Sequence, residues 1–252
     1  MGFRILYRSA SKFKYITQTI AKITDITPLM VNGSGLTVRT LSPDKTTMVS
    51  LNLPVSAFEE FECTGEYVVP VSSDELNKTV RRGTRNDMLE FTFEDGNREL
   101  KLSFIDTKLN VKRTFSVPIR DVAVDKLPEP KIKLTVSMRM LAEDFKSLLG
   151  DAKIAGDEVE FLASKDKVEV KSITPQREYY SLLTLDKPLI SLNVEQESTA
   201  TYAIDLLEAS LKAVGAAESI MLEFGQGLPM RITFELPTGG TLVYIVAPRI
   251  KE

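Results

Sequence analysis

The feature that most constrains the fold is a weak internal repeat. Three short matches recur at offsets of 131 to 133 residues: MLEF at 88–91 and 221–224, FK at 13–14 and 145–146, and an Asp before a helical pattern at Asp74 and Asp205. Several matches at nearly one offset indicate two copies of one structural unit, each about half the chain.

A break between the two copies is visible near the middle of the chain. The segment LPEPK at 127–131 interrupts both helical and strand periodicity, because each proline disfavours helix in the residue before it. We therefore expect an N-terminal domain at 1–118, an interdomain connector at 119–133 and a C-terminal domain at 134–252.

Strand patterns dominate both halves. Apolar residues alternate through the segments 49–53, 89–93, 100–104, 222–224 and 232–236, which is typical of sheets with one buried face. The segments Asp95-Gly96-Asn97 and Thr238-Gly239-Gly240 favour hairpin turns. The predicted fold class is α+β, with mainly antiparallel sheets.

Only four segments carry helical periodicity, two in each half: 11–23, 72–85, 138–153 and 203–214. Each has one apolar stripe that can pack on a sheet. In the third, we expect Leu141, Phe145 and Leu148 to be buried, and Arg139, Lys146 and Lys153, spaced by seven, to share one polar line.

The composition argues against most catalytic chemistry. The sequence has no histidine, and Cys63 is its one cysteine, so Ser/His and Cys/His pairs, thiolate metal clusters and internal disulfides are excluded. We expect no catalytic residue, no metal site and no cofactor. No apolar run approaches the ~20 residues of a membrane helix, so we expect no membrane partner, and the reducing cytoplasm fits the cysteine content.

Charge is segregated along the chain. The formal net charge is −3, yet the four helical windows hold 11 basic against 7 acidic residues. The bases predicted to point away from the sheets are Lys14, Lys22, Lys78, Arg81, Arg82, Arg85, Lys146, Lys153 and Lys212. In the first half this pattern favours a phosphate-facing surface. In the second half, acidic neighbours leave a solvated face and a phosphate-facing surface equally open.

The expected nucleic-acid contact is independent of base sequence. The chain has no zinc-finger spacing, no basic region with heptads and no aromatic-rich single-strand motif. Contacts through Lys and Arg alone go to phosphates, which carry no sequence information. The residues alone therefore predict contact with the phosphates of a nucleic acid, independent of its base sequence.

Several segments resemble a known family. They are LPMRI at 228–232, LVYIVAPRI at 242–250, GLTVRTLSPD at 35–44 and MLEFG at 221–225. Together they resemble the PCNA-type sliding clamps of archaea and eukaryotes, over essentially the whole chain. The resemblance implies the DNA-clamp fold, with two similar domains, each of two helices on a curved sheet, assembling into a three-subunit ring whose helices line the hole. It also implies a non-catalytic processivity factor whose ring encloses duplex DNA of the chromosome, in the cytoplasm or in a eukaryotic nucleus.

The resemblance also implies site residues. The family's basic inner-face positions fall on Lys14, Lys78, Arg81 and Lys212, whereas Lys22, Arg82, Arg85, Lys146 and Lys153 come from helical geometry. The family's partner pocket falls on Leu41, Lys45, Thr46, Leu127, Pro128, Pro229, Ile245, Ala247 and Pro248. This chain has Ile245 where many members have an aromatic, and Lys45 and Thr46 in place of a less charged pair. The implied partners are DNA polymerase, flap endonuclease, DNA ligase, the clamp loader and other clamp subunits.

Two alternatives accompany this interpretation. An enzyme would have to use carboxylate pairs such as Glu59 with Glu60 or Asp87 with Glu90. A checkpoint-type clamp subunit of the DNA damage response would share the fold and the ring. The segments 110–117 and 178–185 are predicted to be the mating edges of the subunit, and the sequence leaves open whether three identical chains or three paralogues form the ring.

Overall fold

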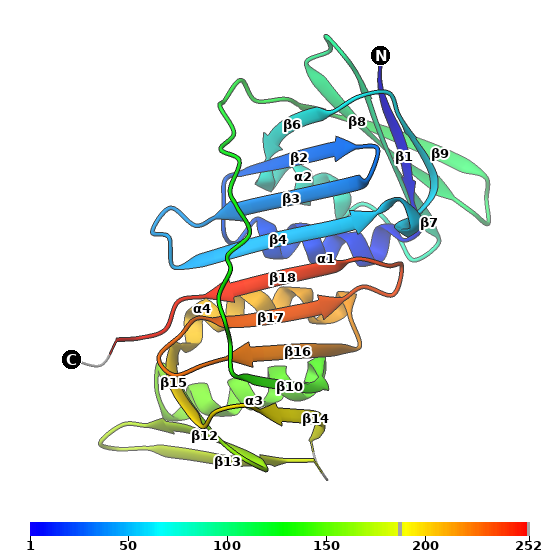
Figure 1. Ribbon diagram of the computed structural model, residues 1–252. Helices are drawn as coiled ribbons and strands as arrows, with labels where there is room; N and C mark the ends of the chain where they lie inside the picture. The colour runs from blue at the N-terminus through cyan, green and yellow to red at the C-terminus, as the bar shows by residue number, and fades with distance from the viewer. Residues whose placement is uncertain (186–187, 251–252) are drawn as a thin grey trace. The chain divides into compact units, whose positions relative to one another are not determined.

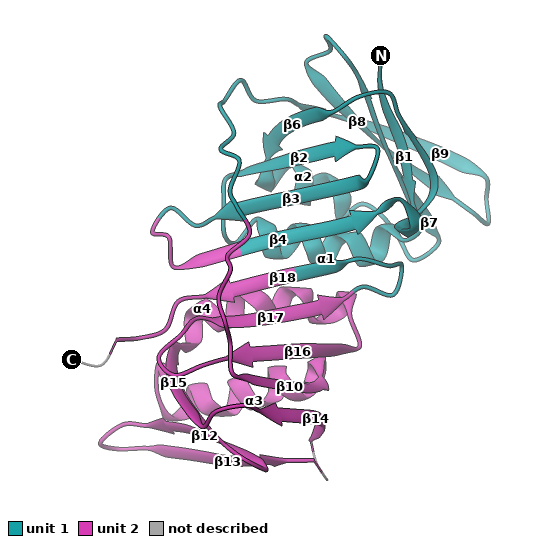
Figure 2. Ribbon diagram, in the orientation of Figure 1, with its two compact units in different colours: residues 1–43, 49–128, 236–242 teal, residues 44–48, 129–235, 243–252 magenta. Residues whose placement is uncertain are grey.

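Residues 1–185 and 188–250 are described by the computed structural model. The chain divides into two units, coloured separately in Figure 2. Unit 1 comprises residues 1–43, 49–128 and 236–242, and unit 2 comprises 44–48, 129–235 and 243–252.

Unit 1 contains two sheets and two helices (Figure 1). One sheet has the order β5-β1-β7-β8-β9 and the other contains β6-β2-β3-β4. The strands are β1 (Gly2–Tyr7), β2 (Ile26–Asn32), β3 (Gly35–Leu41), β4 (Thr47–Pro54), β5 (Phe58–Cys63), β6 (Tyr67–Ser72), β7 (Asp87–Glu94), β8 (Glu99–Asp106) and β9 (Val111–Pro118). The helices are α1 (Ala10–Ile20) and α2 (Ser73–Val80), with a 3-10 turn at Val55–Ala57.

Unit 2 has the same plan. Its sheets have the orders β14-β10-β16-β17-β18 and β13-β12-β11-β15. The strands are β10 (Val136–Leu141), β11 (Glu158–Ser164), β12 (Lys167–Ile173), β13 (Glu178–Thr184), β14 (Leu189–Val194), β15 (Ser198–Ala203), β16 (Ser219–Phe224), β17 (Met230–Glu235) and β18 (Thr241–Val246). The helices are α3 (Ala142–Ala155) and α4 (Ile204–Ser210), and α4 continues as a 3-10 helix, Leu211–Ala216.

The sequence repeat corresponds to structurally equivalent elements. The MLEF segments lie in β7 and β16, which pair antiparallel with β1 and β10 respectively. Phe13 and Phe145 are both fourth in their helices, α1 and α3, and Asp74 and Asp205 are both second in α2 and α4. The repeat thus equates β9 with β18 and β4 with β13, and the predicted α+β class is confirmed.

Each unit buries a cluster of aromatic side chains in its core. In unit 1 Phe13 from α1 makes edge contacts with Tyr7 and Phe91, with ring centroids 5.2 and 5.1 Å apart. In unit 2 Phe161 contacts Phe224 at 5.9 Å, and both are fully buried. Burying a large apolar side chain contributes about 1.5–3 kcal/mol, so the Phe13 contacts hold α1 on its sheet, and the contact of Phe161 with Phe224 holds β11 against β16.

Both predicted hairpin turns are confirmed. Gly96, between β7 and β8, has φ 89°, and Gly239 and Gly240, between β17 and β18, have φ 98° and 86°. A side chain at Gly240 would place its Cβ 2.2 Å from the carbonyl oxygen of Asn52, so this turn requires glycine on two grounds.

The bounds of all four helices differ from the prediction, and two of the differences move predicted residues out of a helix or out of the core. Helix α2 ends at Val80 rather than 85, and Gly83 beyond it packs where a Cβ would lie 2.6 Å from Ala10 Cβ. Helix α3 begins at Ala142 rather than 138, because β10 continues through Leu141. Arg139 is therefore on a strand, and Leu141, expected in the core, is 42% exposed.

Residues 1–185 and 188–250 hold neither a membrane-spanning helix nor a metal cluster. No helix there combines the length and the apolar character that crossing a bilayer requires. No group of three or more Asp, Glu, Cys or His side chains there is arranged to hold a metal ion.

Candidate nucleic-acid interface and partner surface

Helices α1 and α2 lie against each other in unit 1. The hydroxyl of Thr17 donates to the side-chain oxygen of Asn77 at 3.3 Å. Ser9 is the N-cap of α1, and its hydroxyl accepts from the amide of Lys12. Ser72 is the N-cap of α2, and its hydroxyl accepts from the amide of Glu75. These N-caps satisfy amides that the first turn leaves unpaired, and so set where both helices start.

The bases of α1 lie away from its buried face. Lys14 is half-buried, with its ammonium 4.9 Å from the centroid of the Tyr15 ring. Lys22 is exposed but follows the end of the helix, in a turn in which its amide donates to the carbonyl of Thr19. Lys22 therefore lies two residues beyond α1 and not on the helix itself.

The early end of α2 changes the predicted geometry of its arginines. Arg81 is the C-cap, Arg82 lies in the following turn, and Arg85 lies beyond Gly83. The prediction that Arg82 and Arg85 lie on a helix over 72–85 is therefore wrong. Gly83 was the available signal, since glycine just past a helical pattern marks its end.

The bases around α2 are nevertheless exposed and largely uncompensated. Lys78 pairs with Asp74 at 2.6 Å, with both side chains about 70% exposed, and this hydrogen bond raises the pKa of Lys78. Such an exposed pair is weak, so Lys78 can exchange Asp74 for another anion. Arg81, Arg82 and Arg85 have no carboxylate partner among the residues that the structure describes.

The bases of unit 2 are mostly compensated. Lys146 lies 3.0 Å from Glu143 within α3, and Lys153 lies 2.5 Å from Glu208 of α4. Lys212, on the 3-10 continuation of α4, is exposed. Unit 2 therefore offers phosphate fewer uncompensated charges than unit 1.

Arg139, which the sequence placed in line with Lys146, has a different role. It lies on β10 and forms two parallel hydrogen bonds with the carboxylate of Glu235 on β17, at 2.9 and 2.8 Å. The hydrogen bond with Glu235 raises the pKa of Arg139. This bidentate pair crosses the intervening strand β16 and stabilises the sheet.

The predicted partner residues are divided between the two units. In unit 2, the amide of Ala247 donates to the carbonyl of Thr46 at 2.8 Å, and Thr46 in turn donates to Asp44. Lys45 has φ 61°, a conformation that the turn around Asp44 imposes. Ile245 on β18 is half-buried, as are Pro229 and Pro248. The contact between Thr46 and Ala247 joins two of the predicted residues directly.

In unit 1 the predicted residues are Leu41, Leu127 and Pro128. Leu41 is the last residue of β3, and Leu127 belongs to the connector; both are half-buried, and Pro128 is exposed. The guanidinium of Arg39 donates to the carbonyl of Leu127 at 2.9 Å. Sequence reasoning missed Arg39, because no local pattern reports a contact across 88 residues.

The carboxylate pairs required by an enzyme do not form a site. Asp87 and Glu90 lie on β7, three residues apart, so their side chains point to opposite faces of the sheet. Asp87 binds Arg113 at 2.6 Å, and Glu90 binds Arg4 at 2.8 Å and Lys112 at 2.5 Å. Desolvation opposes ionisation of Asp87 and Glu90. The backbone amide of Thr84 and then Arg113 nevertheless lower the pKa of Asp87, and Lys112 and Arg4 lower that of Glu90. Glu59 and Glu60 are likewise paired, with Arg8 and Arg4.

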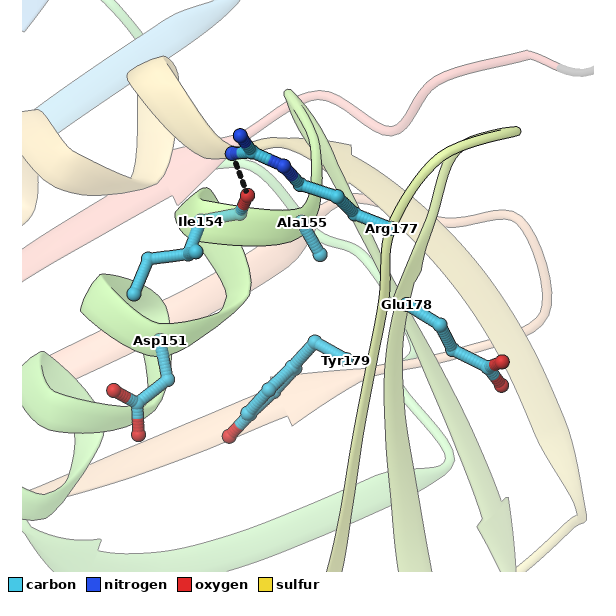
Figure 3. Close-up of a pocket in the computed structure, with 6 residues that line it drawn as sticks. All are labelled: Asp151, Ile154, Ala155, Arg177, Glu178 and Tyr179. Carbon is cyan, nitrogen blue, oxygen red and sulfur yellow. Dashed lines mark hydrogen bonds between the residues drawn. The ribbon is translucent and has the colours of Figure 1, made fainter.

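Two edge strands carry the predicted mating segments. β9 and β13 each end a sheet, and both show exposed apolar side chains, including Phe115 on β9 and Leu182 on β13. Beside β13 is a pocket of about 380 Å³, lined by Asp151, Ile154, Ala155, Arg177, Glu178 and Tyr179 (Figure 3). The guanidinium of Arg177 donates to the carbonyl of Ile154 at 2.9 Å and closes one side of it.

Comparison with known proteins agrees with this architecture. A family model described as proliferating cell nuclear antigen, N-terminal domain, matches residues 3–127. DNA polymerase sliding clamps from Thermococcus sibiricus and Pyrococcus abyssi are 29% and 27% identical over 255 residues, covering all of both chains.

Solved structures share the fold. PCNA from Thermococcus kodakaraensis superposes with a TM-score of 0.91 at 23% identity, covering 98% of this chain and 100% of that one. A chain of the PCNA2–PCNA3 complex from Sulfolobus tokodaii gives 0.88 at 22% identity, covering 98% and 99%. With its two repeated units, its clamp fold and full-length similarity to sliding clamps, the chain belongs to the PCNA-type sliding-clamp family.

Proposed function

We propose that this sliding clamp is one subunit of a three-subunit ring that encloses duplex DNA and tethers DNA polymerase to it. The observation that carries the proposal is the cluster of uncompensated bases around α2 in a chain of net charge −3. A ring holds DNA by enclosure, so its lining needs only weak, sequence-independent attraction. A net acidic protein can therefore serve as a DNA-bound one.

The proposed phosphate-facing residues differ in expected strength. Arg81, Arg82 and Arg85 have no acidic partner among the described residues, and Lys78 has only an exposed one. Lys14 and Lys22 extend the same surface from α1. In unit 2, Lys146 and Lys153 must break their ion pairs with Glu143 and Glu208 before they can bind phosphate. Together with Lys212 they form a surface that is expected to bind DNA more weakly than that of unit 1.

The proposed partner surface binds a short peptide with a glutamine and a hydrophobic–aromatic anchor. Its residues are Leu41, Lys45, Thr46, Leu127, Pro128, Pro229, Ile245, Ala247 and Pro248. Half-exposed apolar side chains of this kind mark an interaction site. The partners proposed to carry such peptides are DNA polymerase, flap endonuclease, DNA ligase and the clamp loader, so that the clamp itself is a scaffold on chromosomal DNA rather than an enzyme.

Assembly is proposed to occur by strand addition between β9 of one subunit and β13 of the next. Exposed sheet edges offer unpaired backbone groups to another chain. The pocket beside β13 has room for an aromatic side chain such as Phe115 from the neighbouring subunit. The proposed domain bounds remain 1–118 and 134–252, joined by the connector. The relatives named above are polymerase clamps, which favours this role over a checkpoint clamp.

If the ring encloses DNA, its retention on DNA should depend on whether the DNA is circular or linear, whereas a protein that only binds the DNA surface should be retained equally on both. Clamps loaded onto closed circular DNA should stay bound during gel filtration and should slide off once a restriction enzyme linearises the circle. Linear DNA blocked at both ends by bound protein is the control and should retain the clamp. Equal retention on open linear and circular DNA would contradict the proposal.

A further inference from the structure

The interdomain connector has no helix or strand of its own over residues 120–134. At its beginning, in unit 1, the amide of Arg120 donates to the carbonyl of Pro70 at 2.8 Å, and its side chain lies 3.2 Å from Glu75. At its end, in unit 2, the amide of Thr135 donates to the carbonyl of Phe224 at 3.0 Å. A segment of this length without periodic contacts needs attachments along its course to keep one conformation.

Arg39 supplies such an attachment in unit 1. Its Nη1 donates to the carbonyl of Leu127 at 2.9 Å, and its Nε donates to the hydroxyl of Ser50 on the adjacent strand β4 at 3.3 Å. The guanidinium is planar and presents its donors in a fixed fork. Anchoring Nε on Ser50 therefore sets the direction in which Nη1 points.

The hydrogen bond acts on a stiff part of the connector. Leu127 precedes Pro128, and a residue before proline is confined to extended conformations. Fixing the carbonyl of Leu127 therefore also fixes how its side chain leaves the backbone. One donor can orient the Leu127-Pro128 pair as a unit.

The same strand carries a second partner residue. Along β3, Leu36, Val38 and Thr40 are buried, whereas Thr37, Arg39 and Leu41 alternate with them on the opposite face. Arg39 and Leu41 therefore share the face on which the connector is held. Figure 1 shows the connector (green) passing across this face of unit 1.

We infer that Arg39 is a positioning residue for the partner surface: it holds Leu127 in the orientation that receives a peptide anchor beside Leu41. This inference rests on the proposed partner surface. Arg39 acts through Leu127 and does not itself contact the peptide. Loss of its hydrogen bond should loosen the connector, while the core of unit 1, to which Arg39 contributes no buried apolar surface, stays intact.

Arg39→Ala tests the inference against a matched control, Arg8→Ala. Arg8 is also in unit 1, its side chain is 48% exposed, and it pairs with Glu59 at 3.0 Å, so both variants remove one positive charge. The probe is a synthetic peptide with a glutamine and a hydrophobic–aromatic anchor, and a scrambled peptide of equal composition controls for non-specific binding. Calorimetry gives the affinity, hydrogen exchange reports on residues 121–127, and melting temperature reports on the fold.

Arg39→Ala should weaken peptide binding about tenfold, the effect of one charge-assisted hydrogen bond. It should speed exchange in the connector and leave the melting temperature near that of Arg8→Ala. Arg39→Lys, which keeps the charge but loses the fork, and Ser50→Ala should give intermediate affinities. Because Ser50→Ala leaves Arg39 in place, it also tests the inference if Arg39→Ala folds poorly.

Wild-type affinity and connector exchange in Arg39→Ala would overturn the inference. If the wild-type protein itself binds no such peptide, the proposed partner surface fails instead. Connector exchange still decides the positioning role of Arg39 in that case: faster exchange in Arg39→Ala alone supports it, and equal exchange overturns it.

Discussion

The carboxylate of Asp87 on β7 and the guanidinium of Arg113 on β9 form an ion pair of 2.6 Å across the intervening strand β8. The Asp87 side chain is fully buried, and its Oδ2 also accepts from the amide of Thr84 at 2.7 Å. On the opposite face of the sheet, Glu90 holds Lys112, the neighbour of Arg113, at 2.5 Å. Two buried carboxylates thus fix consecutive residues of the edge strand proposed to mate with another subunit.

Asp87→Asn should destabilise the protein by about 2 kcal/mol, because it weakens a buried ion pair and leaves Arg113 without its counter-charge. Asp87→Asn should also weaken self-association, because the edge strand β9 loses its ion pair to β7 and is less well ordered. Urea denaturation at fixed protein concentration and sedimentation equilibrium measure the two effects. Glu59→Gln is the control, since it removes an exposed pair with Arg8 and should cost under about 0.5 kcal/mol. Equal behaviour of the two variants would contradict this role of Asp87.

Glu90 should make stability depend on acidity. Desolvation raises its pKa, but hydrogen bonds and charge from Lys112 and Arg4 outweigh this and lower the pKa below the ordinary value. The unfolded chain therefore binds the proton more tightly than the folded one. The stabilisation is fully present above the unfolded carboxyl pKa of about 4.3 and is lost as the pH falls through the folded value.

Melting temperatures measured from pH 7 to pH 3 check this sign. Glu90→Gln should be less stable than the wild type at pH 7, and the gap should narrow as the pH falls. Parallel curves would show that the carboxylate of Glu90 contributes nothing through its ionisation.

Replacing Lys78, Arg81 and Arg85 together by Ala should weaken DNA binding and leave assembly intact. Each phosphate that the variant no longer neutralises reduces the slope of log K against log salt by about 0.9 for duplex DNA. Fluorescence anisotropy across a salt series gives the slope. A triple variant of Arg98, Lys101 and Lys126, which are exposed bases of unit 1 outside α2 and the turn that follows it, removes equal charge and should keep the slope. An unchanged slope in the first variant would show that this surface does not meet phosphate.

Ile245→Asp should nearly abolish binding of the synthetic peptide, because an anchor would then have to bury against a charge. A loss of about 2–4 kcal/mol is expected at a binding hot spot. Titration calorimetry measures it, with sedimentation to confirm assembly. Ile190→Asp on β14, where the isoleucine is 55% exposed, adds the same charge and should bind normally. Wild-type affinity in an assembled Ile245→Asp variant would exclude this residue from the partner surface.

The internal repeat and the turn residues of the sequence predicted the fold well. The MLEF repeat marks two equivalent core strands, β7 and β16. In a strand, alternate side chains point to the same face, so the apolar residues of such a segment must match the buried face of the sheet. The glycine turns were equally readable, since positive φ favours one residue type. These signals are local and steric, which is why they survive in a single sequence.

Helix ends and polar contacts between distant residues could not be predicted as well from the sequence. Helix α3 begins after Leu141, which offers no side-chain cap, so only the alternation of β10 could have shown where the strand stops. The contacts of Arg139 with Glu235 and of Arg39 with Leu127 join residues 96 and 88 positions apart. Such pairs depend on which strands become neighbours, and no periodicity within either segment encodes them.

The two exposed edges, β9 and β13, differ from one another, so the contacts between subunits that we propose through them are heterologous, running head to tail. A contact of this kind generates a closed circle only if the rotation from one subunit to the next divides a full turn evenly; otherwise it propagates as an open helical filament. Edge complementarity therefore sets whether subunits associate, while the angle between successive edges sets whether the assembly terminates. Substitutions that alter this angle without harming either edge should produce fibres rather than monomers.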